Sequence, residues 1–315
     1  MTETLRVAVA SRSFSHHPVL RAELSTLYPN VTFNDSGASL TEDALARFLQ
    51  GHDAAITALE KVNDQLLAQL PDLKIISKYG VGYDMIDIGA LRCRGIRFGW
   101  TGGVNKRSVS ELVISMMISL LRLVPQASHE IRAGQWRQLQ GRQLSGRTVG
   151  IIGCGHVGKD LALLLRSFEC RVLANDIVSF PEFYARSQVE PASLDRVLQE
   201  AEIVTLHLPL NAVTRNLMSR EKLYSMRPGS ILINAARGGL IDEEALKEVL
   251  ANGHLGGAGL DVLAQEPPTD RELLSFQNVL VTPHIGGSSE EAVLAMGRAA
   301  IAGLRTAVIP GNEWL

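Results

Sequence analysis

Residues 148–158 decide the fold of this chain and read Thr-Val-Gly-Ile-Ile-Gly-Cys-Gly-His-Val-Gly. The first five, rich in apolar and β-branched side chains, predict a buried strand, and the glycines after them have the spacing of a dinucleotide-binding loop. Gly153 would make the tight turn, Gly155 would let a pyrophosphate approach the backbone, and Gly158 would let the next helix pack on the strand. We therefore expect a strand, a phosphate-binding loop and a helix here.

The residues after this loop predict which dinucleotide binds. The amides of His156 and Val157 would begin the helix and point at phosphate oxygens. Asp176 lies 18 residues beyond Gly158, a distance at which an acidic side chain can accept hydrogen bonds from both ribose hydroxyls. It would repel a 2′-phosphate, and residues 177–179, Ile-Val-Ser, offer no cation to offset that repulsion. The cofactor predicted is NAD.

Short strand-like runs alternate with helical runs twice along the chain, which predicts two parallel α/β layers. The strands of the first layer are expected at residues 7–10, 31–33, 54–57, 74–77 and 96–98. Those of the second are expected at residues 148–152, 171–175, 203–206, 230–234, 257–262 and 279–282. Helices between the strands are expected to include residues 19–27, 41–48, 157–166 and 242–251.

Longer segments connect the two layers. The pattern predicts one long helix over residues 104–127, followed by an arm at residues 134–146 that contains Trp136. A helical pattern from 288 to about 308 is long enough to return to the first layer. We therefore expect a dinucleotide-binding domain at residues 100–285 and a discontinuous substrate domain at residues 1–99 and 286–315.

Three residues of complementary chemistry lie in tight local contexts within the C-terminal part of the chain. Arg237 stands in Asn-Ala-Ala-Arg-Gly-Gly, Glu266 precedes two prolines, and His284 stands in Thr-Pro-His-Ile-Gly-Gly. A guanidinium is permanently charged and forms a two-pronged match to the carboxylate of a 2-oxo acid. An imidazole carries protons near neutral pH, and a carboxylate can orient it. Together with the glycine loop, these residues predict an enzyme that transfers a hydride.

Composition excludes several other classes of protein. The chain has 315 residues and a formal net charge of −2, with no Lys/Arg cluster on one face, so neither nucleic acid nor an anionic membrane is expected as a partner. A small-molecule substrate is expected instead. Cys93, Cys154 and Cys170 are widely separated and form no CxxC motif, which indicates reduced thiols and no zinc site. No metal is expected.

The sequence also predicts where the protein acts. The N-terminal residues enter a strand-like pattern almost at once, without a charged leader and apolar segment, so a cytoplasmic protein is expected. The longest apolar stretch, residues 112–124, is interrupted by Arg122 and falls short of the ~20 residues of a bilayer span. It predicts a buried core helix.

From residue 73 to about residue 292 the chain resembles the D-2-hydroxyacid dehydrogenase family. This family includes phosphoglycerate dehydrogenases, glyoxylate/hydroxypyruvate reductases, D-lactate, formate and phosphite dehydrogenases, and the C-terminal-binding corepressors. The resemblance runs through the glycine loop, the three contexts above, and the motifs at residues 78–87 (Lys-Tyr-Gly-Val-Gly-Tyr-Asp-Met-Ile-Asp), 103–112 and 206–214. Several ordered motifs at family spacing make the match specific.

The resemblance implies a role for each residue of the predicted active site. Arg237 would bind the substrate carboxylate and polarise the reacting carbonyl. His284 would be the general acid in reduction and the general base in oxidation, and Glu266 would hold the imidazole and stabilise its protonated form. The backbone amides of Val81 and Gly82, in the first domain, would hold the carboxylate across the cleft.

The resemblance also implies a fold and a cofactor surface. The fold would consist of two doubly wound α/β domains with parallel sheets, a Rossmann cofactor domain and a discontinuous flavodoxin-like substrate domain. A homodimer would form through the cofactor domain, by way of the long helix and the arm around Trp136. Further cofactor-binding positions would be Leu208, Pro209, Thr214, Ala235, Ala236, Asp261, which would meet the nicotinamide carboxamide, and Gly286.

The substrate stays open between two classes. Phosphoglycerate dehydrogenases usually place an arginine near residues 56–61 to hold phosphate, but this chain has Leu59 and Glu60 there. An unphosphorylated acid such as glyoxylate or hydroxypyruvate is therefore favoured. The alternative is a phosphoglycerate dehydrogenase with a non-standard phosphate site. Cations near the motifs that could serve such a site are Lys61, Lys78, Lys106 and Arg107.

Two other activities within the family are weighed against reduction of a 2-oxo acid. Formate dehydrogenase is disfavoured because its histidine is usually paired with glutamine rather than with a residue like Glu266, whereas phosphite oxidation stays open. An alternative of another class is an NAD-sensing binding module like the corepressors. The chain lacks the Ser/Pro-rich disordered tails that regulatory proteins often carry.

Overall fold

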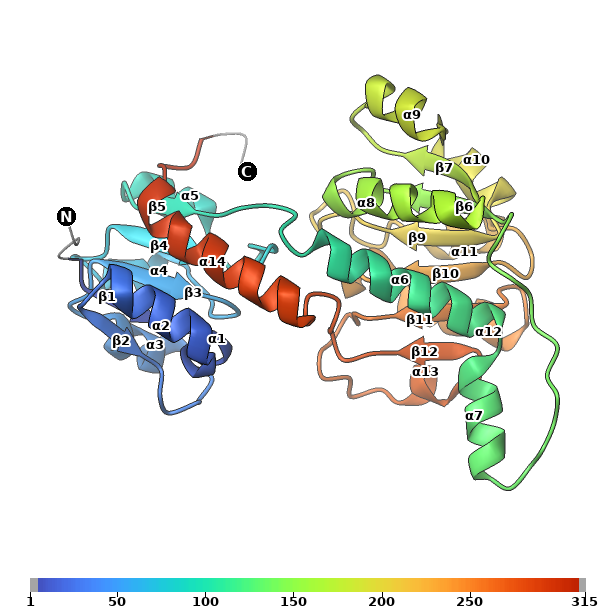
Figure 1. Ribbon diagram of the computed structural model, residues 1–315, viewed down its shortest axis with the longest axis horizontal. Helices are drawn as coiled ribbons and strands as arrows, with labels where there is room; N and C mark the ends of the chain where they lie inside the picture. The colour runs from blue at the N-terminus through green and yellow to red at the C-terminus, as the bar shows by residue number, and fades with distance from the viewer. Residues whose placement is uncertain (1–4, 312–315) are drawn as a thin grey trace. The chain divides into compact units, whose positions relative to one another are not determined.

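The computed structural model describes residues 5–311, which form two compact units (Figure 1). Unit 1 contains the described residues up to Asn105 and from Glu290 onward, and unit 2 contains Lys106–Ser289. The chain therefore passes from one unit to the other twice. Both units are parallel β-sheets interleaved with helices, so the expected α/β class with two doubly wound sheets is confirmed.

Unit 1 is built on a five-stranded sheet with the order β2-β1-β3-β4-β5, which is the flavodoxin-like order. All neighbouring strands run parallel, so their C-terminal ends lie at one edge of the sheet. The strands are β1 (Val7–Val9), β2 (Val31–Phe33), β3 (Ala54–Thr57), β4 (Ile75–Lys78) and β5 (Arg97–Gly99). The helices are α1 (Arg12–His16), α2 (Pro18–Leu27), α3 (Glu42–Leu49), α4 (Asp64–Ala68), α5 (Ile88–Cys93) and α14 (Glu290–Thr306).

Helix α14 joins unit 1 from the far end of the sequence by close packing on β4 and β5 (Figure 1). A Cβ on Gly303 would lie only 2.3 Å from the Ser77 hydroxyl, so only glycine lets the helix come this near. The same hydroxyl donates a 2.6 Å hydrogen bond to the carbonyl of Ala300. Beyond the helix, Val308 pairs with Phe98 as a short antiparallel bridge. These contacts make unit 1 discontinuous in sequence.

Unit 2 is built on a seven-stranded parallel sheet with the order β12-β11-β10-β9-β6-β7-β8. The direction of winding reverses between β6 and β9, as in a Rossmann fold, and ligands bind such sheets at the C-terminal ends of the strands beside this reversal. The strands are β6 (Thr148–Ile152), β7 (Arg171–Asn175), β8 (Val189–Pro191), β9 (Ile203–Leu206), β10 (Ile231–Asn234), β11 (Gly257–Leu260) and β12 (Val279–Val281). The helices are α6 (Lys106–Leu121), α7 (Val124–Arg132), α8 (His156–Leu165), α9 (Pro181–Ser187), α10 (Leu194–Glu200), α11 (Arg220–Ser225), α12 (Glu243–Ala251) and α13 (Glu272–Ser275), with 3-10 turns at Arg166–Phe168 and Gly238–Leu240.

The hydrophobic core of unit 2 lies on both faces of this sheet, between the sheet and the helices. Helices α6 and α8 pack on one face and α10, α11 and α12 contribute to the cluster on the other. The central strands β9, β10 and β11 are buried along their whole length, which is why apolar residues prevail in them without alternating with exposed polar ones. The rigid centre of the sheet thus holds the loops at its C-terminal edge.

The prediction of one helix over residues 104–127 is wrong. The chain forms α6 and α7 instead, and the two are bent by 63°. Leu123 takes a left-handed backbone conformation with φ 55°, and Pro125 lacks the amide hydrogen that a continuous helix would need. Figure 1 shows α7 and the irregular segment after it extending away from the sheet of unit 2. Within residues 5–311, no single helix has the length and hydropathy of a bilayer span, and α6 and α7 reach them only as this bent pair.

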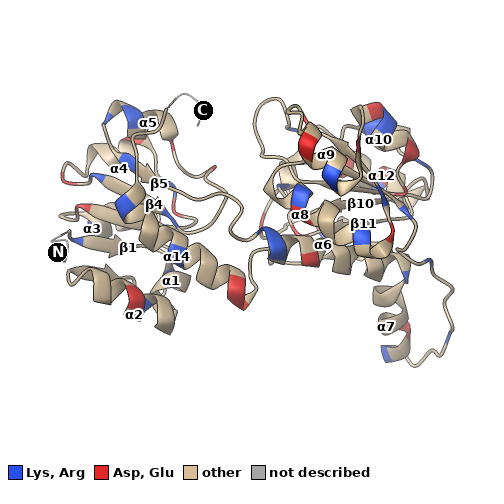
Figure 2. Cartoon of the chain, turned by 45° about the horizontal axis from the view of Figure 1, so that its top comes forward, with Lys and Arg blue, Asp and Glu red and all other residues tan. Residues whose placement is uncertain are grey.

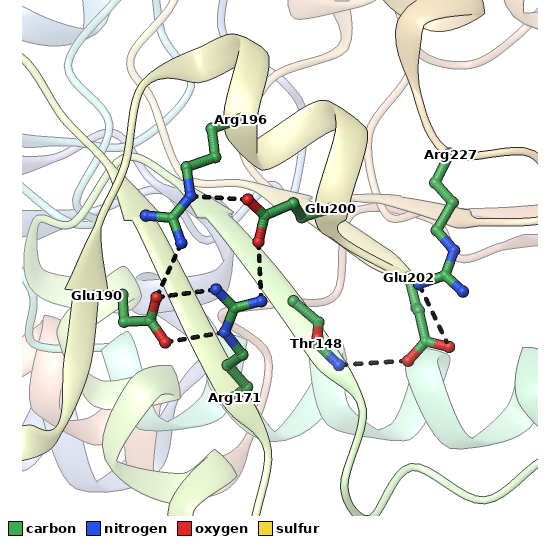
Figure 3. Close-up of polar contacts among 7 residues, drawn as sticks. All are labelled: Thr148, Arg171, Glu190, Arg196, Glu200, Glu202 and Arg227. Atoms are coloured by element: carbon green, nitrogen blue, oxygen red, sulfur yellow. Dashed lines mark hydrogen bonds and ion pairs between the residues drawn. The ribbon is translucent and has the colours of Figure 1, made fainter.

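Opposite charges are mixed on α9 and α10 of unit 2 (Figure 2). Figure 3 shows four charged residues of unit 2 in a closed ring, with Arg171 and Arg196 each paired to both Glu190 and Glu200 at 2.8–3.0 Å. The hydrogen bond from Arg171 lowers the pKa of Glu190 to about 2. The side chains are 37–44% exposed, so solvent screens these pairs and each contributes little to stability. The ring joins β7, β8 and α10.

Candidate active site

The glycine loop lies between β6 and α8 at the point where the sheet reverses. Gly153 has φ +96°, and a Cβ added to it would lie 2.5 Å from the carbonyl oxygen of His207. A Cβ on Gly158 would lie 2.2 Å from the carbonyl oxygen of Gly153. Both contacts are with backbone atoms that cannot easily move. The protein's own packing therefore requires glycine at these two positions.

Gly155 differs from its neighbours, because the protein's packing does not require glycine there. It is exposed, its φ is −76°, and a Cβ would meet no atom within 4 Å. It precedes the first turn of α8, which has no side-chain cap for the amides of His156 and Val157. Uncapped amides at the start of a helix favour an anion. An open glycine beside them fits the close approach of a pyrophosphate.

Asp176 follows β7 and links its loop to the glycine loop. One carboxylate oxygen accepts a 2.6 Å hydrogen bond from the amide of Cys154, and the other accepts a 2.9 Å bond from the amide of Val178. A carboxylate has about four acceptor positions, so Asp176 can still accept bonds from ribose hydroxyls. It therefore both shapes the loop and suits a ribose. The thiol of Cys154 itself is buried, which raises its pKa to about 11.

We expect Asp176→Ala to weaken NADH binding and to reduce discrimination against NADPH. Loss of one or two charge-assisted hydrogen bonds, each worth about 1.5–3 kcal/mol, would raise the Kd for NADH at least about tenfold. Asp176→Asn is the matched variant, because it keeps the shape and one acceptor but removes the charge that opposes a 2′-phosphate. Fluorescence titration of both variants with NADH and NADPH measures the effect. Equal or better kcat/KM with NADPH in the unmodified protein would contradict the prediction.

The loop after β9 lies beside the glycine loop. The Leu208 side chain would lie 3.0 Å from a Cβ on Gly153, and the Thr214 hydroxyl donates a 2.7 Å hydrogen bond to the carbonyl of Pro209. These contacts place Leu208 next to the glycine loop and Thr214 next to Pro209, so the loop after β9 forms a wall beside the glycine loop. His207 contacts Thr205 through its Nε2, and desolvation lowers its pKa to about 3. It stays neutral and brings no charge to this wall.

The turn after β10 carries Arg237 and is fixed by a buried asparagine. Asn234 donates its side-chain amide to the carbonyl of Arg237 at 2.8 Å and accepts from the amide of Ala236 at 3.1 Å. Arg237 is partly buried, and its Nη1 donates to the carbonyl of Ala236 at 2.7 Å. Ala235 lies within the same turn. Sequence reasoning did not assign this role to Asn234, although a buried asparagine at a strand end is a signal for it.

Glu266 and His284 form a hydrogen-bonded pair. Glu266 Oε2 lies 2.8 Å from His284 Nδ1, and Glu266 Oε1 accepts a 3.0 Å bond from the amide of Leu263. The carboxylate can only accept, so Nδ1 donates and Nε2 is left to exchange protons with a ligand. The His284 side chain is 48% exposed and that of Glu266 is 39% exposed. The pair is accessible to a ligand.

Asp261 holds the turn that carries His284. It is 1% exposed, and its carboxylate accepts hydrogen bonds from the Thr282 hydroxyl at 2.5 Å and from the amides of Ile285 and Gly286 at 2.8 and 2.7 Å. Its carbonyl accepts from the amide of His284 at 2.9 Å. The resemblance implied only a nicotinamide contact for Asp261. The structure shows that it also organises the turn, leaving about one acceptor position for a ligand.

The sheet of unit 2 brings the three chemical groups to one edge. Arg237, Glu266 and His284 follow β10, β11 and β12, which are neighbours in the sheet and run parallel. Val81 and Gly82 follow β4 at the C-terminal edge of the other sheet, in unit 1, where the Trp100 indole donates to the carbonyl of Val81 at 2.8 Å. Across residues 5–311, no group of His, Cys, Asp and Glu side chains is arranged to hold a metal ion.

Two of the four cations considered for a second anionic group are already engaged within the protein. Lys78 is only 4% exposed, and its ammonium donates to the carbonyl of Ala58. Arg107 forms two 2.9 Å hydrogen bonds with the carboxylate of Asp160. Lys78 is therefore poorly placed to bind a further anion. Lys61, Lys106 and Arg107 are exposed, although Arg107 already pairs with Asp160.

Comparison with known proteins identifies the family. The family model described as the NAD binding domain of D-isomer specific 2-hydroxyacid dehydrogenases matches residues 114–286, more than half of the chain. A hydroxypyruvate reductase of Thermotoga maritima is 37% identical over 264 residues, 82% of this chain and 85% of that protein. A D-3-phosphoglycerate dehydrogenase of Mycobacterium tuberculosis is 37% identical over 233 residues, 73% of this chain but only 44% of that protein.

A solved structure agrees with this assignment. A glyoxylate reductase from Paecilomyes thermophila superposes with a TM-score of 0.86 at 26% identity, covering 96% of this chain and 95% of that one. The chain spans most of the length of the reductases it matches but less than half of the mycobacterial phosphoglycerate dehydrogenase. The family model and the length of the matches together show that the chain belongs to the D-isomer specific 2-hydroxyacid dehydrogenase family and is an NAD-dependent enzyme of that family.

Proposed function

We propose that this enzyme interconverts a small 2-oxo acid and its (R)-2-hydroxy acid, with bound NAD(H) supplying or accepting the hydride at C2. The observation that carries the proposal is the 2.8 Å hydrogen bond between Glu266 and His284. It fixes a proton carrier at the sheet edge where Arg237 also lies. A proton carrier and a carboxylate-binding guanidinium are the groups that reduction of a 2-oxo acid requires from the protein.

Each residue has one task in this proposal. Arg237 binds the substrate carboxylate and polarises the carbonyl, and the amides of Val81 and Gly82 contribute further donors from unit 1. His284 gives the proton on Nε2 to the carbonyl oxygen during reduction and takes it back from the hydroxyl during oxidation. Glu266 accepts the hydrogen bond from Nδ1 and so fixes the orientation and tautomer of the imidazole. Asp176, the amides of His156 and Val157, and the positions at Leu208, Pro209, Thr214, Ala235, Ala236, Asp261 and Gly286 are proposed to hold the cofactor.

The substrate we propose carries one carboxylate and no phosphate. Arg237 with the Val81 and Gly82 amides supplies one carboxylate site. A second anionic group would need its own cation, and both Lys78 and Arg107 are engaged within the protein. The relatives named above as hydroxypyruvate and glyoxylate reductases match this chain over most of their length, which supports the same choice. Hydroxypyruvate and glyoxylate are the substrates favoured.

We expect kcat/KM with NADH to be higher for hydroxypyruvate or glyoxylate than for 3-phosphohydroxypyruvate. Steady-state assays of all three substrates measure this. The contrary result, a clear preference for the phosphorylated acid, would require a cation at the edge of unit 1 or at the start of α6. Lys61, Lys106 and Arg107 are the exposed candidates. Loss of that preference in Lys61→Gln, Lys106→Gln or Arg107→Gln would identify the non-standard phosphate site.

The same assays separate the enzyme from an NAD-sensing binding module. A module of that kind would bind NADH, but NADH oxidation with any of the three 2-oxo acids would not exceed the rate without enzyme. Turnover that depends on His284 supports the enzyme. Binding of NADH with no turnover of any of these acids would instead favour the sensing role.

We also propose a homodimer formed through unit 2, in the cytoplasm. Helix α7 and the segment after it carry exposed apolar side chains: Val124, Ile131 and Trp136, the last 87% exposed. Exposed apolar surface of this kind marks an interaction site. Light scattering of the purified protein measures the assembly.

The proposal of a cytoplasmic enzyme is supported by the three cysteines, which form no disulfide bonds and so suit a reducing compartment.

A further inference from the structure

Lys247 on α12 is a charged residue in a nearly buried position, and no part of the proposed mechanism uses it. Its side chain is 10% exposed, and its ammonium contacts three carboxylates: Glu244 at 2.8 Å, Asp270 at 2.9 Å and Glu272 at 3.0 Å. These hydrogen bonds hold the pKa of Lys247 well above its usual range, and the bond to Glu244 contributes most to this rise. All three ammonium hydrogens have a partner, so the charge is permanent and fully engaged.

Two of these partners lie far from Lys247 in sequence, in the segment that carries Glu266. Asp270 and Glu272 follow Glu266 by four and six residues. On the other side of Glu266, the amide of Ala264 donates a 2.6 Å hydrogen bond to Glu243, which also lies on α12. Helix α12 therefore holds the segment both before and after Glu266.

Between its two ends the segment has little else to hold it in place. Residues 264–272 are all exposed, so no apolar side chain of theirs is buried in the core. At the ends, a Cβ on Gly238 would lie 1.9 Å from the backbone carbon of Leu263, and the side chain of Leu273 is buried in the core. The position of Glu266 relative to His284 therefore depends on polar contacts, and those of Lys247 are the most numerous at the C-terminal end.

We infer that Lys247 is a positioning residue of the active site, holding the segment that presents Glu266 to His284. The inference rests on the proposed function of that pair. A hydrogen bond of 2.8 Å weakens steeply when its partners move apart by an ångström, and misplacement of this size can cost about 10²-fold in rate. Lys247 contacts neither the substrate groups nor the glycine loop in this scheme, so its loss should act on proton transfer alone.

The test compares Lys247→Met with Glu266→Gln, using kcat for 2-oxo acid reduction as a function of pH. Methionine keeps an unbranched apolar chain in the buried space and removes the ammonium. Without the Glu266 carboxylate in place, Nδ1 of His284 loses its acceptor, and the pH profile of kcat in the reductive direction should shift. We expect both variants to show this shift, with kcat lowered about tenfold in Lys247→Met and the Kd for NADH almost unchanged.

A double variant and a matched control give the test its specificity. If Lys247 acts through Glu266, adding Lys247→Met to Glu266→Gln should cause no further loss of kcat. Glu248→Gln is the control on the same helix, because Glu248 contacts Tyr224 at 2.7 Å and Arg220 rather than the segment that carries Glu266. It should leave the pH profile unchanged. A shift in the control equal to that of Lys247→Met would mean that any loss of an α12 contact has this effect, and would overturn the inference.

A milder variant covers the case in which Lys247→Met does not fold. Asp270 and Glu272 are 58% and 62% exposed, so Asp270→Ala with Glu272→Ala removes the same contacts from the surface side and should shift the profile in the same direction. Provided that His284→Ala is inactive, either of two results would overturn the inference. One is an unshifted pH profile in these variants. The other is a loss of kcat, on adding them to Glu266→Gln, that equals the loss they cause in the wild type. Wild-type turnover in His284→Ala would overturn the proposed function, and this inference with it.

Discussion

His284→Ala is expected to lower kcat for 2-oxo acid reduction by about 10²–10⁴, the usual contribution of a positioned general acid. The proton that Nε2 would deliver must then come from water, which has no fixed place beside the carbonyl. The Kd for NADH should stay almost unchanged, because the glycine loop and Asp176 lie at β6 and β7 and the histidine at β12. Single-turnover assays for the rate and fluorescence titration for the affinity separate the two quantities.

The backbone at His284 calls for a second variant. Its φ is 56°, in the left-handed region, where asparagine is tolerated better than alanine. His284→Asn should therefore keep the turn around Asp261 and lose as much activity as His284→Ala. If the asparagine variant is active and the alanine variant is not, the loss comes from the backbone rather than from proton transfer. If both keep more than about a tenth of kcat, a role as general acid is excluded.

Three strands of unit 2 could be predicted from the sequence to the residue. The expected runs 148–152, 171–175 and 203–206 are β6, β7 and β9. Each is mostly apolar, because helices cover both faces of the sheet, and each is followed by glycine or a polar residue. The short edge strand β8 was not anticipated, because its three residues, Val-Glu-Pro, carry no strand pattern of their own. The bend at Leu123 was not predicted, because the residues on both sides of Pro125 follow a helical pattern and this proline was not read as the end of the helix.

The chemical groups of the site could be predicted from the sequence, but most of the residues that hold these groups in place could not. A guanidinium, a carboxylate and an imidazole in short contexts identified Arg237, Glu266 and His284 as candidates. The groups that hold them, such as the Asp261 carboxylate beneath the His284 turn, act through hydrogen bonds that only the order of the strands brings together. The same holds for Arg107, whose partner Asp160 lies 53 residues away on a neighbouring helix. Sequence spacing gives no distance across a sheet or between helices.

Arg237→Gln is expected to lower kcat/KM for 2-oxo acids by about 10²–10⁴, because two charge-assisted hydrogen bonds of about 1.5–3 kcal/mol each would be lost. KM should rise and kcat should fall, since the guanidinium would bind the ground state and also polarise the carbonyl as charge develops on its oxygen. The turn itself should survive, because Asn234 donates to the backbone carbonyl of Arg237 and accepts from the amide of Ala236, and the substitution leaves both groups in place. Arg227→Gln is the matched control, a loss of arginine in the same unit whose ion pair with Glu202 is 3.9 Å long.

Arg237→Lys decides whether charge alone would suffice. Lysine keeps the positive charge but cannot form two parallel hydrogen bonds to a carboxylate. If the fork geometry matters, the lysine variant should lie between the wild type and Arg237→Gln in kcat/KM, with most of the remaining deficit in kcat. Steady-state assays with glyoxylate and NADH measure both constants. Wild-type kcat/KM in Arg237→Lys would show that a point charge is enough. Wild-type values in Arg237→Gln would mean that the Val81 and Gly82 amides, or another group, bind the carboxylate without the guanidinium.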